Sequence, residues 1–296
     1  MDLDQPIPLR THAAFHLRTL GTPEAVKAIC DAVLQKEDSE LMRHELAYIL
    51  GQMQNTEACP VLERILEDAD ENTLVRHEAA EALGAIGHQP AKPVLEKYLN
   101  DPAIEVAETC RLAVDLLDYR AQCDSKSNAP SSSVFNSVDP APAEEDDTLS
   151  VQDLSAVLLD TKEGLFKRYR AMFALRNKNS DEGAMALVAA MADPSALVRH
   201  EIAYVLGQMQ RICTVPGLAK VLQNVQEHRM VRHEAAEALG AIGGAEAEEI
   251  LKPFQDDEEL VVKESCDVAL DTMDYWTNGF PAASAAATNA TATAST

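Results

Sequence analysis

The sequence repeats itself at two levels, and this limits the folds that the chain can adopt. Residues 75–87, Val-Arg-His-Glu-Ala-Ala-Glu-Ala-Leu-Gly-Ala-Ile-Gly, recur unchanged at residues 231–243, an offset of 156. Residues 43–54 recur at 199–210 with the same offset and two differences. Within each half, the Arg-His-Glu triplets of the two phrases lie 33 residues apart. A short period inside a duplicated chain is typical of repeat proteins, in which each unit packs against its neighbours.

Each repeat unit has the pattern of a helical hairpin. Apolar side chains fall at helical spacing over residues 75–86, and Gly87 follows where such a helix would end. Pro90 lies just beyond, a second apolar helix follows over 94–99, and Asn-Asp-Pro at 100–102 breaks it. A single hairpin cannot bury its own apolar face. We therefore predict an all-α fold, a solenoid of stacked α-hairpins in two pseudo-symmetric halves of about four repeats each.

Changes in composition divide the chain into four parts. We predict an N-terminal repeat half over residues 1–120 and a C-terminal repeat half over residues 150–280. Residues 121–149 are rich in Ser, Pro and acidic residues, which predicts a flexible linker. The Ala/Thr-rich residues 281–296 are predicted to form a disordered tail. The second half opens with a helical segment at residues 151–160 that has no counterpart in the first half.

The charge and the cysteines narrow the classes of function. The net charge of −24 disfavours nucleic acid as a partner and favours a basic protein or a cationic substrate, unless the acidity serves solubility alone. The six cysteines include no Cys-x-x-Cys pair, and Cys110 and Cys266 occupy matching repeat positions, which suggests packing. We see neither a signal peptide nor an apolar run long enough for a bilayer. The expectation is a soluble, cytoplasmic protein.

The His-Glu dyads carry the strongest functional signal. They occur four times, twice in each half, and supply imidazole and carboxylate ligands from equivalent points of a periodic scaffold. If the two halves face each other about a pseudo-twofold axis, the dyads can surround a pair of ions. Such a ligand set suits non-haem iron, and zinc or manganese remain possible. The predicted ligands are His44, Glu45, His77, Glu78, His200, Glu201, His233 and Glu234.

A purely structural role explains the His-Glu dyads less well than metal binding does. Each dyad follows an arginine, so Arg-His-Glu might be a repeated ion pair, and we expect these arginines to form inter-repeat salt bridges. However, half of the eight histidines fall in the motif, and the outer units lack it, because Glu108 and Glu264 have no preceding His. A structural feature would recur in every unit. The arginines are Arg43, Arg76, Arg199 and Arg232.

The two phrases and the four dyads resemble the deoxyhypusine hydroxylase family over about residues 9–120 and 150–276. The resemblance implies a HEAT-like solenoid that holds two Fe(II) ions between its halves, with dioxygen as co-substrate. It implies a monooxygenase that hydroxylates the deoxyhypusine side chain on translation initiation factor 5A to form hypusine. It also implies that all eight dyad residues belong to the iron site. Apart from the resemblance, we expect a monomer without nucleic acid or membrane partners.

Other readings stay open from the residues alone. One is a non-catalytic HEAT-repeat scaffold that binds a basic protein partner. A second is a relative of the phycobilin lyase repeat proteins, which share the Val-Arg-x-x-Ala-x-x-Ala-Leu-Gly phrase. A third is a zinc or manganese hydrolase on the same ligands. The excess of carboxylates over what two ions need suggests a further hypothesis, that some glutamates bind the amines of a cationic substrate.

Overall fold

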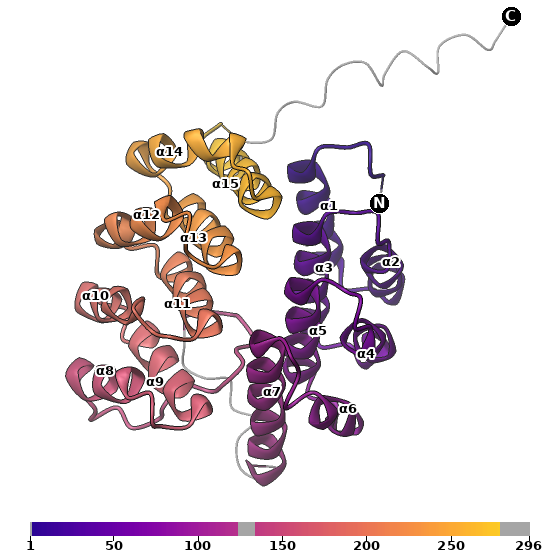
Figure 1. Cartoon of the computed structure of the whole chain (residues 1–296), viewed down its shortest axis with the longest axis horizontal. Coiled ribbons are helices and arrows are strands. Elements are labelled where there is room, and N and C mark those ends of the chain that lie inside the picture. Colours follow the sequence, from indigo (N-terminus) through magenta and orange to yellow (C-terminus); the bar gives the residue numbers. More distant parts are fainter. Residues whose placement is uncertain (1, 124–133, 279–296) are drawn as a thin grey trace, which may run out of the picture.

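The computed structural model describes residues 2–123 and 134–278, and within these residues it is all-helical. Helices pair into hairpins that stack into two curved halves, and the inner helices of one half face those of the other (Figure 1). This confirms the predicted fold class. The first half consists of α1 (Ile7–Leu20), α2 (Pro23–Val33), α3 (Glu40–Met53), α4 (Cys59–Glu67), α5 (Thr73–Ile86), α6 (Lys92–Lys97) and α7 (Ile104–Cys123). The second half consists of α8 (Val151–Leu159), α9 (Leu165–Asn177), α10 (Asp181–Ala190), α11 (Ala196–Met209), α12 (Val215–Gln223), α13 (Arg229–Ile242), α14 (Ala245–Leu251) and α15 (Leu260–Asn278).

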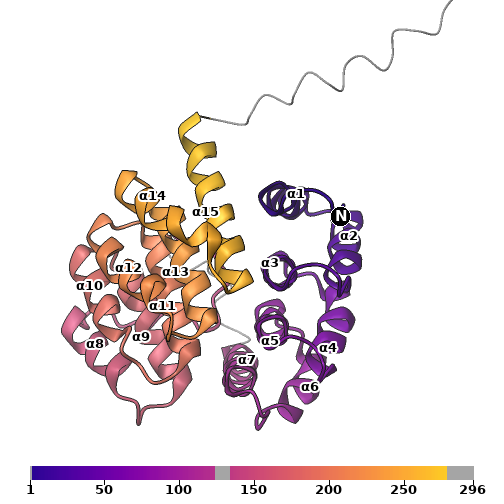
Figure 2. The same ribbon diagram turned by 45° about the horizontal axis from the view of Figure 1, so that its top comes forward.

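The two halves correspond helix by helix from α1 and α9 onward. The leading helix α8 packs against α9 and has no counterpart among the described residues of the first half. In both views α1, α3, α5 and α7 form the inner layer of one half, and α9, α11, α13 and α15 form that of the other (Figure 2). The halves also meet at their outer ends, where His12 Nε2 of α1 lies 2.6 Å from Asp271 Oδ2 of α15.

Small residues let the inner helices pack closely. A Cβ added to Gly84 of α5 would lie 3.0 Å from the Cα of Ala113 in α7, and one added to Gly240 of α13 would lie 2.7 Å from the Cα of Ala269 in α15. Because real Cβ atoms do not approach backbone so closely, these two positions require glycine. Cys110 and Cys266 are buried and unpaired at equivalent places, as expected for packing residues.

The motif arginines tie each repeat to the next, as the sequence predicted. The guanidinium of Arg76 is buried, donates from Nε to the carbonyl of Leu66, and lies 2.7 Å from Asp101 Oδ2. Arg232 repeats this arrangement with Leu222 and Asp257. Arg43 and Arg199 pair in the same way with Glu71 and Glu227. The arginine of each triplet therefore connects adjacent repeats. The histidine and glutamate that follow it lie on the inner face of the half.

The segment predicted as a flexible linker differs from expectation where it is described. Residues 121–123 complete α7, and residues 134–149 lie against both halves. The side-chain amide of Gln52 in α3 hydrogen-bonds both the N–H and the C=O of Val138, at 2.8 and 3.1 Å. Asp139 accepts two hydrogen bonds from Arg176 of α9, at 2.9 and 2.6 Å. The low apolar content is offset by these polar contacts, which a composition argument cannot anticipate. Residues 124–133 and the predicted tail lie outside the described residues.

No helix in the described part of the chain is long and apolar enough to cross a membrane.

Replacing Arg76 by Met is expected to destabilise the protein by about 3 kcal/mol, because it leaves the buried Asp101 carboxylate and the Leu66 carbonyl without their partner. Lys27→Met provides the control, since the Lys27–Asp31 pair is exposed and its loss is expected to leave the stability nearly unchanged. Urea unfolding of both variants measures the difference. Equal losses would contradict a structural role for the arginine ladder.

Candidate metal centre

The four dyads occupy the same register on four inner helices. The helices begin after the caps Ser39, Asn72, Ser195 and His228, whose side chains each accept a hydrogen bond from a backbone N–H of the first turn. Each motif histidine then falls in the second turn of its helix, on α3, α5, α11 and α13. All four histidines therefore lie at the same distance from the N-terminal end of their helices. Where the inner helices of the two halves face each other, the four imidazoles can meet.

The four imidazoles meet between the halves. Within a half, the ring centroids of His44 and His77 lie 5.4 Å apart, as do those of His200 and His233. Across the halves, His44 lies 5.2 Å from His233 and His77 lies 5.4 Å from His200. Sequence analysis predicted this convergence from a pseudo-twofold arrangement of the halves.

Several ring nitrogens of this cluster are buried without a hydrogen-bond partner among the described residues. Both nitrogens of His77, Nδ1 of His200 and Nε2 of His233 are in this state, whereas Nε2 of His44 and of His200 each have a carboxylate oxygen within 3.3 Å. His77 and His233 are fully buried. Buried polar atoms are rarely left unsatisfied, since each costs roughly 1–3 kcal/mol. Nitrogen lone pairs gathered in this way fit metal ions, which take neutral imidazole as a ligand.

Carboxylates complete the donor set. Glu78 Oε2 lies 3.2 Å from His44 Nε2, and Glu234 Oε2 lies 3.3 Å from His200 Nε2, so the two halves match. Among the described residues, three groups have donor atoms within 4.8 Å of one another, and together they contain the four histidines, Glu78, Glu234 and Glu237.

Glu45 and Glu201 lie beside these groups and are not members of them. Glu45 Oε1 lies 3.2 Å from His44 Nδ1, and Glu201 Oε1 is buried without a hydrogen-bond partner in the described chain. Both residues line a cavity next to the imidazoles. Their assignment as metal ligands stays a prediction.

Glu237 was not among the residues predicted from the dyads. Its Oε1 lies 3.2 Å from His233 Nδ1 and accepts a hydrogen bond from Ser265 Oγ at 2.9 Å. The signal in the sequence was its place four residues after His233, since residues i and i+4 share a helix face. Glu81 stands in the same relation to His77 and also lines the cavity.

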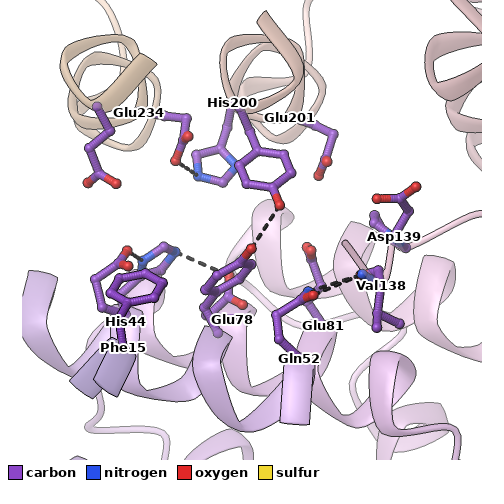
Figure 3. A pocket seen from close by; sticks show the side chains of 15 residues that line it. Phe15, His44, Gln52, Glu78, Glu81, Val138, Asp139, His200, Glu201 and Glu234 are labelled. Carbon is purple, nitrogen blue, oxygen red and sulfur yellow. Dashed lines mark hydrogen bonds and ion pairs between the residues drawn. The ribbon is translucent and has the colours of Figure 1, made fainter. Parts of the chain in front are cut away.

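The cavity has a volume of about 170 Å³ and lies between the halves (Figure 3). Tyr48 and Tyr204, which occupy equivalent positions of the two halves, line it and share a hydrogen bond of 2.8 Å between their hydroxyls. No Lys or Arg is part of the lining, which contains seven acidic residues. They are Glu45, Glu78, Glu81, Asp139, Glu201, Glu234 and Glu237.

The electrostatics of the cavity favour bound cations. Burial raises the pKa of Glu81, Glu201 and Glu237 well above the usual range, and the charges of neighbouring carboxylates raise it further. Burial lowers the pKa of His77 and His233, and the other imidazoles add to the effect. For His44, burial is outweighed by the charges of Glu78 and Glu45, which raise its pKa. Burial is the cause that these groups share, since it disfavours the charged form of each; the neighbouring carboxylates add to it for the glutamates and outweigh it for His44.

Comparison with known proteins gives a consistent family. A model of HEAT repeats matches residues 2–71, 32–114 and 184–271. A deoxyhypusine hydroxylase from Xenopus laevis is 51% identical over 280 residues, covering 94% of this chain and 90% of that protein. The one from Homo sapiens is 49% identical over 278 residues, covering 94% and 89%. The solved structure of human deoxyhypusine hydroxylase in complex with glycerol superimposes with a TM-score of 0.88 at 48% identity, covering 93% of each chain.

Replacing His77 by Leu is expected to reduce metal binding without unfolding the protein. The metal-free variant should be at least as stable as metal-free wild type, because Leu removes two unpaired ring nitrogens from a fully buried position. Metal content by elemental analysis and melting temperatures with and without metal measure both effects. His16→Leu, at an exposed position of α1, is the control and should bind metal normally. Loss of the fold in metal-free His77→Leu would indicate a structural role instead.

Proposed function

This chain belongs to the deoxyhypusine hydroxylase family, and we propose that it is a di-iron enzyme that uses dioxygen to hydroxylate the deoxyhypusine side chain of translation initiation factor 5A. Family membership makes it an enzyme, a deoxyhypusine monooxygenase, and the reading as a non-catalytic scaffold is therefore set aside. The iron, the oxygen and the identity of the protein substrate belong to the proposal. So do a monomeric state and a cytoplasmic location.

The observation that best supports iron is the donor set. Four imidazoles lie together, several with unsatisfied nitrogens, and Glu78 and Glu234 lie beside them at equivalent places; shared between two ions, this set would give each ion two histidines and one glutamate. Two imidazoles and one carboxylate with open positions are typical of non-haem iron sites that handle oxygen. In this proposal the four histidines, Glu78 and Glu234 would hold the ions. Oxidation of a carbon–hydrogen bond by dioxygen is the chemistry that the bound ions would supply.

The remaining residues bind the substrate and shield the reaction. Deoxyhypusine is a lysine whose side-chain nitrogen carries an aminobutyl group, so it bears two ammonium groups on an unbranched chain. A cavity of about 170 Å³, well below the roughly 300–1,000 Å³ of pockets for drug-sized ligands, suits such a chain. Its seven acidic residues attract the ammonium groups. Tyr48 and Tyr204 bridge the halves beside the imidazoles and limit the access of water.

The proposal separates two classes of motif glutamate. Glu78→Gln and Glu234→Gln are each expected to lose about one of the two iron ions. Their carboxylates lie within 3.3 Å of Nε2 of His44 and of His200, respectively. Glu45→Gln and Glu201→Gln are expected to retain more iron and to lose turnover, because these side chains line the cavity outside the donor groups. Iron per chain and turnover are measured for all four variants. Equal iron loss in all four would mean that every dyad glutamate is a ligand.

The reaction itself is tested with factor 5A that carries deoxyhypusine. Protein purified with about two irons per chain is expected to form hypusine in air and none under strictly anaerobic conditions. A zinc-loaded sample provides the control and should be inactive. Hypusine formed at the same rate without oxygen, or by the zinc-loaded sample, would overturn the proposal.

A further inference from the structure

Glu81 and Glu237 are equivalent residues of the two halves, and the structure uses them differently. Both follow the motif histidine of their helix by four residues and both line the cavity. The thirteen-residue phrases that contain them are identical. The difference between them therefore comes from their surroundings, and it bears on how the proposed substrate is held.

Glu237 is committed to the metal centre. It accepts a hydrogen bond from Ser265 Oγ of α15 at 2.9 Å, and its Oε1 lies 3.2 Å from His233 Nδ1. A carboxylate placed on the second nitrogen of a ligand histidine fixes the orientation of the ring. Glu237 is also a member of one of the donor groups with His233 and Glu234.

Glu81 has none of these contacts. The residue equivalent to Ser265 is Thr109 of α7, whose hydroxyl donates instead to the carbonyl of Glu105 in its own helix, at 2.8 Å. His77 Nδ1 has no hydrogen-bond partner among the described residues. The Glu81 side chain makes no hydrogen bond or ion pair that the described part of the structure records, and its carboxylate faces the cavity (Figure 3).

A second unpaired oxygen lies at the same end of the cavity. Glu201 is 2% exposed, and its Oε1 has no hydrogen-bond partner in the described chain. Burial raises the pKa of Glu201, and the charges of Glu81 and Asp139 raise it further. Figure 3 draws Glu81, Glu201 and Asp139 together on one side of the pocket, with His44 and Phe15 on the other. Asp139 is neutralised by the two hydrogen bonds from Arg176, but Glu81 and Glu201 have no such cation.

Residues 138–140 close this end. They line the cavity and are held there by Gln52 from one half and Arg176 from the other. Phe15 of α1 lines the opposite side (Figure 3). The connection between the halves thus makes a pseudo-symmetric cavity directional. An unbranched cationic chain that enters from the side of Phe15 would end next to Glu81 and Glu201.

Building on the proposed function, we propose that Glu81 binds the terminal ammonium group of the deoxyhypusine side chain, with Glu201 beside it. This contact fixes how far the aminobutyl chain enters the cavity, and so determines which carbon is presented to the metal centre. Glu81 is then a specificity-determining residue, whereas its equivalent Glu237 positions a metal ligand.

The test compares two forms of factor 5A under anaerobic conditions, so that the iron-loaded enzyme binds without turnover. One form carries deoxyhypusine, and the other carries N-butyl-lysine, which lacks only the terminal amine. Wild type is expected to prefer the amine-bearing form by about 10-fold or more, the effect of one charged hydrogen bond. In Glu81→Gln the preference should fall to within about 3-fold, with affinity for the butyl form unchanged. Calorimetry measures the affinities, and iron content and melting temperature verify each variant.

Glu237→Gln is the matched control, because it changes the same residue at the equivalent position. It is expected to keep the preference for the terminal amine and to alter iron retention instead. Glu81→Asp keeps the charge on a shorter side chain and should restore part of the preference. A wild-type preference that persists in Glu81→Gln, or that is lost equally in Glu237→Gln, would overturn the inference. Wild type that neither binds nor hydroxylates the deoxyhypusine form would instead remove the proposed function on which it rests.

Discussion

The rest of the site depends on one constraint, which is that four imidazoles meet between two helical stacks with several nitrogens unsatisfied. Burying an imidazole nitrogen without a partner is unfavourable, and so is gathering seven acidic side chains, four of them buried, around one small cavity. A bound cation would stabilise both the imidazole nitrogens and the carboxylates. In the proposed function, metal ions bind the imidazole nitrogens of the cluster. A cationic substrate then pairs with the carboxylates of the cavity that do not bind an ion.

Repetition of one helical phrase places the imidazoles and carboxylates of the site. Each Arg-His-Glu triplet sends its arginine back into the joint between repeats and its histidine and glutamate toward the facing half. One helical phrase thus provides both the joint and the donor atoms. Glycines at the contacts of the inner helices, such as Gly84 and Gly240, keep the spacing between repeats short enough to bring neighbouring dyads together. Duplication of the half then supplies the second set of imidazoles and carboxylates.

Symmetry is broken where the chain passes from one half to the other. Residues 138–140 lie at one end of the cavity only, and the exchange of Ser265 for Thr109 leaves Glu81 without the contacts of Glu237. Thr109 bonds its own helix because a threonine hydroxyl can reach the carbonyl four residues back. Small local differences of this kind turn a symmetric cluster into a site with a direction, which an unsymmetrical substrate requires.

Much of this protein follows from its sequence. Helical periodicity, the 156-residue duplication and the triplets at fixed distance from each helix cap determine the hairpins, the two halves, the salt-bridge role of the arginines and the meeting of the histidines. These features are local or repeat regularly, so a linear pattern records them. Only the tertiary structure decided which glutamates lie beside the imidazole nitrogens, that Glu237 joins them, and that part of an acidic, Pro-containing connection lines the cavity. Those outcomes depend on contacts between residues far apart in the chain, such as Gln52 with Val138, 86 positions away, and composition holds no information about such contacts.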